Sequence, residues 1–347
     1  MFPIDVTTGG YDPAMLAKFD DLAATSGLPA PLVNLLPGIR PAGQPAGQLT
    51  EAGARLLDPT GAMTAGAPMC PPEGDAGTGM VATNSIAPGT GNVSAGTSIF
   101  AMVVLEEKLR QAHHELDLVT TPAGDLVAMV HCNNGASELD SWASLFTELT
   151  AALGLAVDKP TVFDTVIRSA LDGEPDCGGL IAYNYLSGEP ITGLHEGRPL
   201  VLRTPGSRLT LANFMRSQLF TALATLRIGM DILQKTEHVH VSRMFAHGGL
   251  FRTKGVAQRF LAAAINTPVS VGDIATEGGA WGIAVLAAYL SSGSPGRTLH
   301  KFLQDIVFTD AKLETLYPEP ADVAGFDAYA ARFIAALPIE QTAASHT

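Results

Sequence analysis

Two short glycine-rich segments hold the residues whose types and spacing could do chemistry. The first, Gly74-Asp75-Ala76-Gly77, places one carboxylate among small residues, and the second, Gly96-Thr97-Ser98, follows with Thr97 at a separation of 97 − 75 = 22 residues. A turn of glycine and hydroxyl residues lets backbone N–H groups approach phosphate oxygens, because no Cβ intrudes. The pair predicts a general base, Asp75, facing a bound phosphate. The alternatives are a turn aspartate that bonds its own backbone and an ordinary strand-end turn.

Regular elements must position these residues. The separation between the two segments leaves room for a short helix, a turn and a strand, and residues 98–104 (SIFAMVV) are typical of a buried strand. Two more strands are predicted to run into glycine turns: 126–131 leads to Gly135, and 239–246 leads to Gly248-Gly249. Three such turns in one chain predict an edge that binds a nucleotide.

Helical periodicity fills the rest of the chain. Asp12, Thr50 and Thr210 are expected to cap helices, because side-chain oxygens of these types accept the first free N–H groups of a helix. The predicted helices cover 11–22, 52–57, 138–153, 211–230, 256–265, a small-residue stretch from Thr276, and the tail; further strands are expected at 180–185 and 269–271. In the helix 138–153, the apolar residues Leu139, Trp142, Leu145, Phe146, Leu149 and Leu153 form one stripe. Alternating strands and helices predict an α/β fold.

Composition limits the class of protein. The 347 residues are 46% hydrophobic and 16% charged, which is enough for a sizeable core and about two domains. A net charge of −13 argues against general affinity for nucleic acid or anionic membranes. The three cysteines form no CxxC pair, the N-terminus lacks a signal-peptide pattern, and the longest apolar run, 99–105, is too short to span a bilayer. A cytoplasmic location is predicted.

The order of these motifs resembles the FGGY family of carbohydrate kinases. In that family a GD loop carries the catalytic aspartate, and a GTS turn follows at this separation. The segment His247-Gly248-Gly249 resembles the adenosine motif of the family, and 277–284 resembles its late E-x-x-x-x-G-A-A helix. The loop 187–190 and the helix after Thr210 fit the same layout, nearest to the xylulokinase-like members.

The resemblance implies an actin-like ATPase architecture of two ribonuclease H-like domains with a cleft between them. It implies ATP and Mg²⁺, and phosphoryl transfer to a sugar or polyol hydroxyl, with a pentulose such as xylulose as the expected substrate. The implied roles are Asp75 as general base, Gly96 and Thr97 at the β- and γ-phosphates, Gly135 at the phosphates or ribose, Gly248 and Gly249 along the α-phosphate and adenosine, and Thr253 at the base or ribose.

The chain departs from the family at its beginning. Members start with a strand and a D-x-G-T-[ST] phosphate turn. This chain has similar residues in a different order, Asp5-Val6-Thr7-Thr8-Gly9, and they do not match the motif. We therefore expect residues 1–84 to be the remnant of a sugar-binding N-terminal domain and 85–345 a complete ATP-binding domain. As a kinase the chain is then incomplete, and alone it should turn over sugar poorly or not at all. No metal ligand is predicted in this chain, since the family's Mg²⁺ ligands are expected in the part of the N-terminal domain that this sequence does not include. An apolar face left exposed would favour a homodimer.

Two alternatives remain open from the sequence. One is a non-catalytic nucleotide-binding or regulatory module of the same fold, and the other is an actin- or chaperone-like ATPase without a sugar substrate. His238 and His240 could ligate a metal from one face of a strand, but no further ligand completes a site, so they are interpreted as surface residues. Trp142 and Trp281 are expected in the core.

Overall fold

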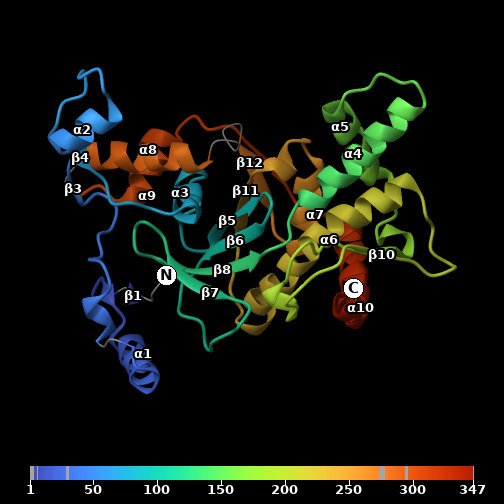
Figure 1. Ribbon diagram of the computed structural model, residues 1–347, viewed down its shortest axis with the longest axis horizontal. Coiled ribbons are helices and arrows are strands. Elements are labelled where there is room, and N and C mark those ends of the chain that lie inside the picture. The colour runs from blue at the N-terminus through green and yellow to red at the C-terminus, as the bar shows by residue number, and fades with distance from the viewer. Residues whose placement is uncertain (1–3, 6, 29–30, 273–277, 294–295, 347) are drawn as a thin grey trace.

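A computed structural model describes residues 4–5, 7–28, 31–272, 278–293 and 296–346 (Figure 1). Its centre is a mixed sheet of seven strands in the order β13-β12-β11-β5-β6-β8-β7. These strands are β5 (Thr90–Ala95), β6 (Ile99–Val104), β7 (Asp117–Thr120), β8 (Leu126–Cys132), β11 (Arg243–His247), β12 (Val269–Gly272) and β13 (Leu313–Leu316). The α/β class predicted from the sequence is confirmed, although β5, β7 and β13 had not been assigned to definite residues.

The direction of the strands brings the glycine turns to one edge. β11 runs parallel to both β5 and β12, while β6 is antiparallel to β5 and to β8. β5, β8, β11 and β12 therefore point the same way, and their carboxyl ends meet. The predicted strand at 239–246 begins later, at Arg243, and ends on His247.

Helices cover both faces of the sheet (Figure 1). One face carries α6 (Leu211–Asp231), α7 (Val256–Ile265) and α10 (Pro320–His346), with the small sheet of β9 (Ile181–Tyr183) and β10 (Leu200–Leu202) beside them. The other face carries α3 (Asp75–Ala82), α8 (Gly278–Ser291) and α9 (Leu299–Phe302). α6 is buried on all sides, as expected of a helix at the centre of a core.

Several helix starts follow the predicted caps. The Asp12 carboxylate accepts the Ala14 N–H at 2.9 Å at the start of α1 (Pro13–Ser26). Thr50 caps α2 (Glu51–Leu57) and Thr210 caps α6 in the same manner. The predicted start of the small-residue helix, Thr276 and Glu277, lies outside the described residues, and α8 is seen from Gly278 onward.

The predicted apolar stripe of α4 (Ser137–Ala152) is only half confirmed, since Leu139 belongs to the core and Phe146 packs against it. Its outer half is exposed: Leu145 by 51%, Leu149 by 53% and Leu153 by 67%. The reason is that α4 pairs with a helix missing from the sequence prediction, α5 (Lys159–Ser169), in a hairpin that stands out from the body (Figure 1). Trp142 packs edge-on against Phe214, with ring centroids 4.7 Å apart, but Trp281 is 38% exposed and does not belong to the core.

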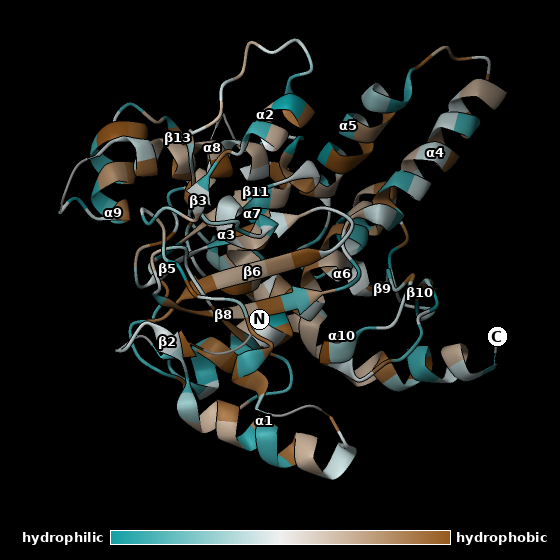
Figure 2. Ribbon diagram, turned by 60° about the vertical axis from the view of Figure 1, so that its left-hand side comes forward, coloured by the Kyte–Doolittle hydropathy of each residue, from teal (hydrophilic) through white to brown (hydrophobic). Residues whose placement is uncertain are grey.

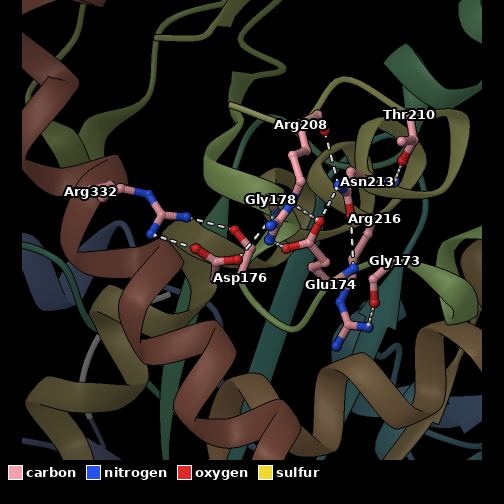
Figure 3. A network of polar contacts seen from close by, with 9 residues as sticks. All are labelled: Gly173, Glu174, Asp176, Gly178, Arg208, Thr210, Asn213, Arg216 and Arg332. Atoms are coloured by element: carbon pink, nitrogen blue, oxygen red, sulfur yellow. Dashed lines mark hydrogen bonds and ion pairs between the residues drawn. The ribbon is translucent and has the colours of Figure 1, made fainter. Parts of the chain in front are cut away.

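A polar network fixes the start of α6 (Figure 3). The Asn213 side-chain oxygen accepts the Glu174 N–H at 2.7 Å, and the Glu174 carboxylate pairs with Arg208. From α10, Arg332 reaches Asp176 at 3.1 Å. These contacts tie the loop 173–178 to α6 and α10 and so hold the helical layer in one arrangement.

The segment before α3 has little core of its own. Among its described residues only Ala23, Leu32 and Ala54 are buried. Besides α1 and α2 it contains the two-stranded pairs β1 (Ile4–Asp5) with β2 (Gly10–Tyr11) and β3 (Gly47–Gln48) with β4 (Pro68–Met69), and the short helix η1 (Leu32–Asn34). α1 stands away from the sheet (Figure 2). No helix among the described residues is long and apolar enough to cross a membrane.

Candidate active site

The turns after β5 and β8 are joined to each other. The Gly135 N–H donates to Thr97 O at 2.8 Å, and the Ala136 N–H donates to Gly96 O at 2.9 Å. Both turns lie at the carboxyl ends of their strands, next to Gly248 at the end of β11. The structure thus brings together the glycine turns that the sequence predicted to form one edge.

Thr97 offers the clearest free groups at this edge. The residue is exposed, and neither its N–H nor its hydroxyl has a hydrogen-bond partner among the described residues. The Gly96 N–H, by contrast, already donates to Ser98 O at 2.9 Å. Thr97 can therefore give two hydrogen bonds to a ligand oxygen, whereas Gly96 serves mainly to close the turn.

The other glycines differ in why they must be glycine. A Cβ on Gly135 would lie 2.6 Å from Gly96 O, and one on Gly248, whose φ is +107°, would lie 2.4 Å from Ala95 O. Both are therefore required by packing of the turns on each other. Gly249 has nothing within 4 Å of its Cβ position, so its face is open. The Gly135 N–H is already used, which leaves that residue to position Thr97 rather than to donate to a ligand.

A cavity of about 600 Å³ opens beside these turns. Gly96, Thr97, Gly249 and Thr253 line it on the sheet side, and α4 and α5 close the other side with Asp140, Lys159, Phe163 and Asp164. The volume is within the usual range for a small-molecule or cofactor site. The α5 residues escaped sequence prediction, although Asp158-Lys159-Pro160 carries the cap and early proline of a helix start.

Two ion pairs balance the acidic side chains of this cavity. Lys159 Nζ lies 3.1 Å from an Asp140 oxygen, and Arg168 Nε lies 2.7 Å from an Asp164 oxygen. Arg168, and after it the Thr253 hydroxyl, hold the pKa of Asp164 below its ordinary value. Thr253 is 4% exposed, so it lies deeper in the wall than an exposed ligand-binding residue would.

Asp75 begins α3 at the same edge. The Gly79 Cβ position is 3.2 Å from the His247 ring, at the end of β11, while Ala82, at the far end of α3, lines the same cavity as Phe245 in the middle of that strand. Asp75 is four residues before Gly79, which is about one turn of helix or roughly 6 Å beyond the end of the strand. Its carboxylate is exposed, and among the described residues it accepts only the N–H of Ala76, at 2.9 Å. The site therefore presents an accessible carboxylate beyond the glycine turns.

A close contact with α8 holds α3 in place. A Cβ on Gly282 would lie 2.0 Å from Thr78 O, so the two helices approach at a distance that only glycine permits. Below them, His247 Nε2 lies 3.2 Å from Asn92 Nδ2, and burial lowers the pKa of His247. A neutral imidazole thus fills the space between α3 and the sheet.

Two carboxylates near the site have unusual surroundings. Burial raises the pKa of Glu73, whose Oε1 accepts the Gly74 N–H at 2.9 Å. Glu189, in the loop after β9, is fully buried, and burial raises its pKa as well. Its Oε2 accepts the Asn134 side-chain amide at 3.1 Å, while its Oε1 has no partner within the described part of the chain.

Asn134 is a positioning residue that the sequence did not single out. Besides its contact with Glu189, its side-chain oxygen accepts the Leu186 and Ser187 N–H groups at 2.9 and 3.0 Å. The turn carrying Gly135 is therefore fastened to the loop 184–189. The only sequence signal for this was that an Asn-Asn-Gly turn and a Ser-Gly-Glu-Pro loop each follow a strand.

The described residues contain no cluster of three or more His, Cys, Asp or Glu side chains that could hold a metal ion. The acidic residues of the large cavity, Asp140 and Asp164, are paired with cations. The described residues therefore assemble no protein-held site for Mg²⁺, and we assign no step to a metal here.

The comparisons with known proteins agree with this geometry. Residues 91–291 match the model of the C-terminal domain of the FGGY family of carbohydrate kinases, which is more than half of the chain. No curated protein matches the sequence significantly.

Solved kinase structures share the fold. A xyloylose kinase from Brucella ovis matches with a TM-score of 0.70 and 18% identity over 96% of this chain and 62% of that one. A xylulose kinase from Rhodospirillum rubrum gives 0.71 and 17% over 94% and 61%, and Plasmodium falciparum glycerol kinase with ADP gives 0.67 and 16% over 97% and 61%. The chain thus spans about three-fifths of the length of these structures. The actin-like ATPase fold implied by the sequence resemblance is confirmed.

Proposed function

Because the chain belongs to the FGGY family of carbohydrate kinases, we propose that it supplies the ATP-binding part and the general base of an enzyme that phosphorylates a sugar or polyol hydroxyl. The observation that carries this proposal is the exposed Asp75 carboxylate beyond the edge where the glycine turns border a 600 Å³ cavity. A base and a phosphate-binding turn on one edge are the parts that phosphoryl transfer requires.

In this proposal the nucleotide occupies the large cavity. The free N–H and hydroxyl of Thr97 donate to β- or γ-phosphate oxygens, and the open face of Gly249 lets the α-phosphate or ribose approach the backbone. Gly96, Gly135 and Gly248 keep the turns in register, and Thr253 forms part of the wall near the base or ribose. Mg²⁺ would arrive with the nucleotide phosphates.

Asp75 then acts on the acceptor. Its carboxylate takes the proton of the sugar hydroxyl, the hydroxyl oxygen forms a bond to the γ-phosphorus, and the bond from that phosphorus to the ADP oxygen breaks. A base in this position contributes about 10²–10⁴ in rate. Its exposure in this chain leaves it accessible to a substrate that approaches from the side away from the sheet.

The finer assignments are also proposals. We infer a pentulose substrate, a cytoplasmic location, and a division into a sugar-side segment, 1–84, and an ATP-binding domain, 85–345. The small number of buried residues before α3 supports a boundary near that helix. α3 itself packs on α8 and shares a core with it, so it is one of the elements through which the two proposed parts contact each other.

Nucleotide titration and coupled ADP release test the proposal. The chain should bind ATP in the presence of Mg²⁺ by calorimetry. In an enzyme that contains this chain together with the rest of the sugar-binding domain, pentuloses should stimulate ADP release more than aldoses do. Asp75→Asn should keep the ATP affinity and lose about 10²-fold or more of the sugar-dependent rate. Asp21→Asn, a change of another exposed aspartate on α1, is the matched control and should change neither quantity. Absence of ATP binding, or an unchanged rate in Asp75→Asn, would refute the assignment.

A further inference from the structure

A second cavity, separate from the one assigned to the nucleotide, lies on the other side of the Gly248–Gly249 turn. It encloses about 430 Å³ between the start of α7 and the strands β12 and β13. Gly248 and Arg252 border it, and Arg252 also borders the large cavity, so the two spaces are neighbours. Its volume suits a small metabolite.

Positive charge gathers in this second cavity. Its lining includes the basic side chains of Arg252, Lys254 and Lys312 and one acidic side chain, Glu314, in a chain whose net charge is −13. None of the three cations forms an ion pair or a side-chain hydrogen bond with any described residue. Cations that face a cavity without a partner raise the local concentration of anions there.

The buried side-chain amide of Gln258 also lines this cavity. It offers a hydrogen-bonding group for a ligand that carries more than a charged group. Gln258 is 3% exposed. Its Nε2 donates to Val269 O and to Glu314 O, both at 2.9 Å, so its side-chain oxygen is the atom without a partner among the described residues. That oxygen can accept a hydrogen bond from a hydroxyl group.

The beginning of α7 supports the same interpretation. Gly255 is its N-cap and gives no side-chain hydrogen bond to the first N–H groups of this ten-residue helix. The first of these groups, the Val256 N–H, already donates to Thr253 O at 3.4 Å. The uncapped N–H groups after it favour a negatively charged ligand.

We propose that the cavity lined by Arg252, Lys254, Lys312 and Gln258 binds a small phosphorylated polyol or sugar, at a site distinct from the nucleotide. The cations bind the phosphate group, and Gln258 accepts a hydroxyl of the carbon chain. Since both cavities share Arg252 and the Gly248–Gly249 turn, such a ligand would lie next to the nucleotide phosphates.

Calorimetric titration of the chain with ribose 5-phosphate tests the proposal. Binding should occur with ribose 5-phosphate and not with ribose, and it should persist when a non-hydrolysable ATP analogue saturates the large cavity. Lys312→Gln and Lys254→Gln should each weaken it about two- to fivefold, the range expected for one exposed ion pair. Lys301→Gln is the matched control, because Lys301 is also exposed and unpaired within the described chain but lies on α9, outside the cavity.

Three results would overturn the assignment: no binding of ribose 5-phosphate, displacement of it by the ATP analogue, or equal weakening by Lys301→Gln. Failure of the chain to bind ATP would refute the nucleotide site and leave this titration to be judged separately.

Discussion

Substitution of Gly282 by alanine tests the close approach of α8 to α3, the helix that begins with Asp75. The new Cβ would lie 2.0 Å from Thr78 O, a backbone atom that cannot swing aside. Ordinary contact between such atoms begins near 3.4 Å, so α3 and α8 must separate by about 1.4 Å (3.4 − 2.0). Overpacking of this kind typically costs about 1–3 kcal/mol, and the better helix propensity of alanine returns up to about 1 kcal/mol. We expect Gly282→Ala to lower the free energy of unfolding by about 1–2 kcal/mol.

The same displacement of α3 should also lower the rate of phosphoryl transfer. Asp75 is three residues from Thr78 on a single short helix, so a displacement of α3 moves its carboxylate by a similar distance. A misplacement of about 1 Å can cost about 10² in rate. In an enzyme that contains this chain together with the rest of the sugar-binding domain, sugar-dependent ADP release should therefore fall much further in Gly282→Ala than the loss of stability alone would explain, while ATP affinity stays close to that of the original protein.

Gly279→Ala supplies the matched control on the same helix. Its Cβ would lie 3.7 Å from the Thr78 hydroxyl, an ordinary contact, and the position is exposed. This variant should be as stable as the original chain or slightly more stable. Urea unfolding of the three proteins decides the matter. If Gly282→Ala and Gly279→Ala unfold at the same urea concentration, the close contact between α3 and α8 does not exist.

Three further predictions concern the phosphate turn and the buried charges. Thr97→Val removes a free hydroxyl and should weaken ATP binding by about 1 kcal/mol, or roughly fivefold by calorimetry, without loss of stability. Burial raises the pKa of Glu189 above 4.5, so the folded protein holds that proton more tightly than the unfolded chain and loses stability as pH rises from about 4.5 toward the raised value. Glu189→Gln removes this loss, and its unfolding free energy minus that of the original chain should increase with pH across this window; a constant difference would contradict it. Asp322→Asn leaves the buried Arg216 guanidinium without its charged partner and should cost about 3–5 kcal/mol in urea unfolding, whereas Asp327→Asn, at a residue whose side chain is 52% exposed, should cost under about 1 kcal/mol.

The parts of the fold that the sequence predicted best are those set by local rules. The cap at Thr210 and the apolar spacing after it are local, and α6 begins where they indicate. The helix at 256–265 was predicted with its observed bounds. The helix at 138–153 is observed one residue earlier, but only half of its apolar stripe is buried. The burial of the stripe depends on a partner: α5 covers one side of the hairpin, and Leu145 and Leu149 remain exposed.

The site was predicted in outline, since glycines after strands are visible in a sequence. The role of each glycine was not predicted, because that role depends on contacts with atoms from segments distant in the sequence. Gly135 and Gly249 look alike in sequence, but one packs against Gly96 O and the other faces open space. The contact of Asn134 with Glu189, 55 residues away, follows from the path of the chain and has no local signal.

The helix contact between Thr78 and Gly282 joins residues separated by 282 − 78 = 204 positions. During synthesis from the N-terminus, the segment that carries Asp75 therefore emerges long before the surface that holds it. Contacts of such sequence separation form late, because most of the loop-closure entropy must be lost first. Acquisition of a correctly placed base should thus be among the last events of folding, after the sheet and the glycine turns have formed, and nascent chains that end before α8 should contain Asp75 without a fixed position for it.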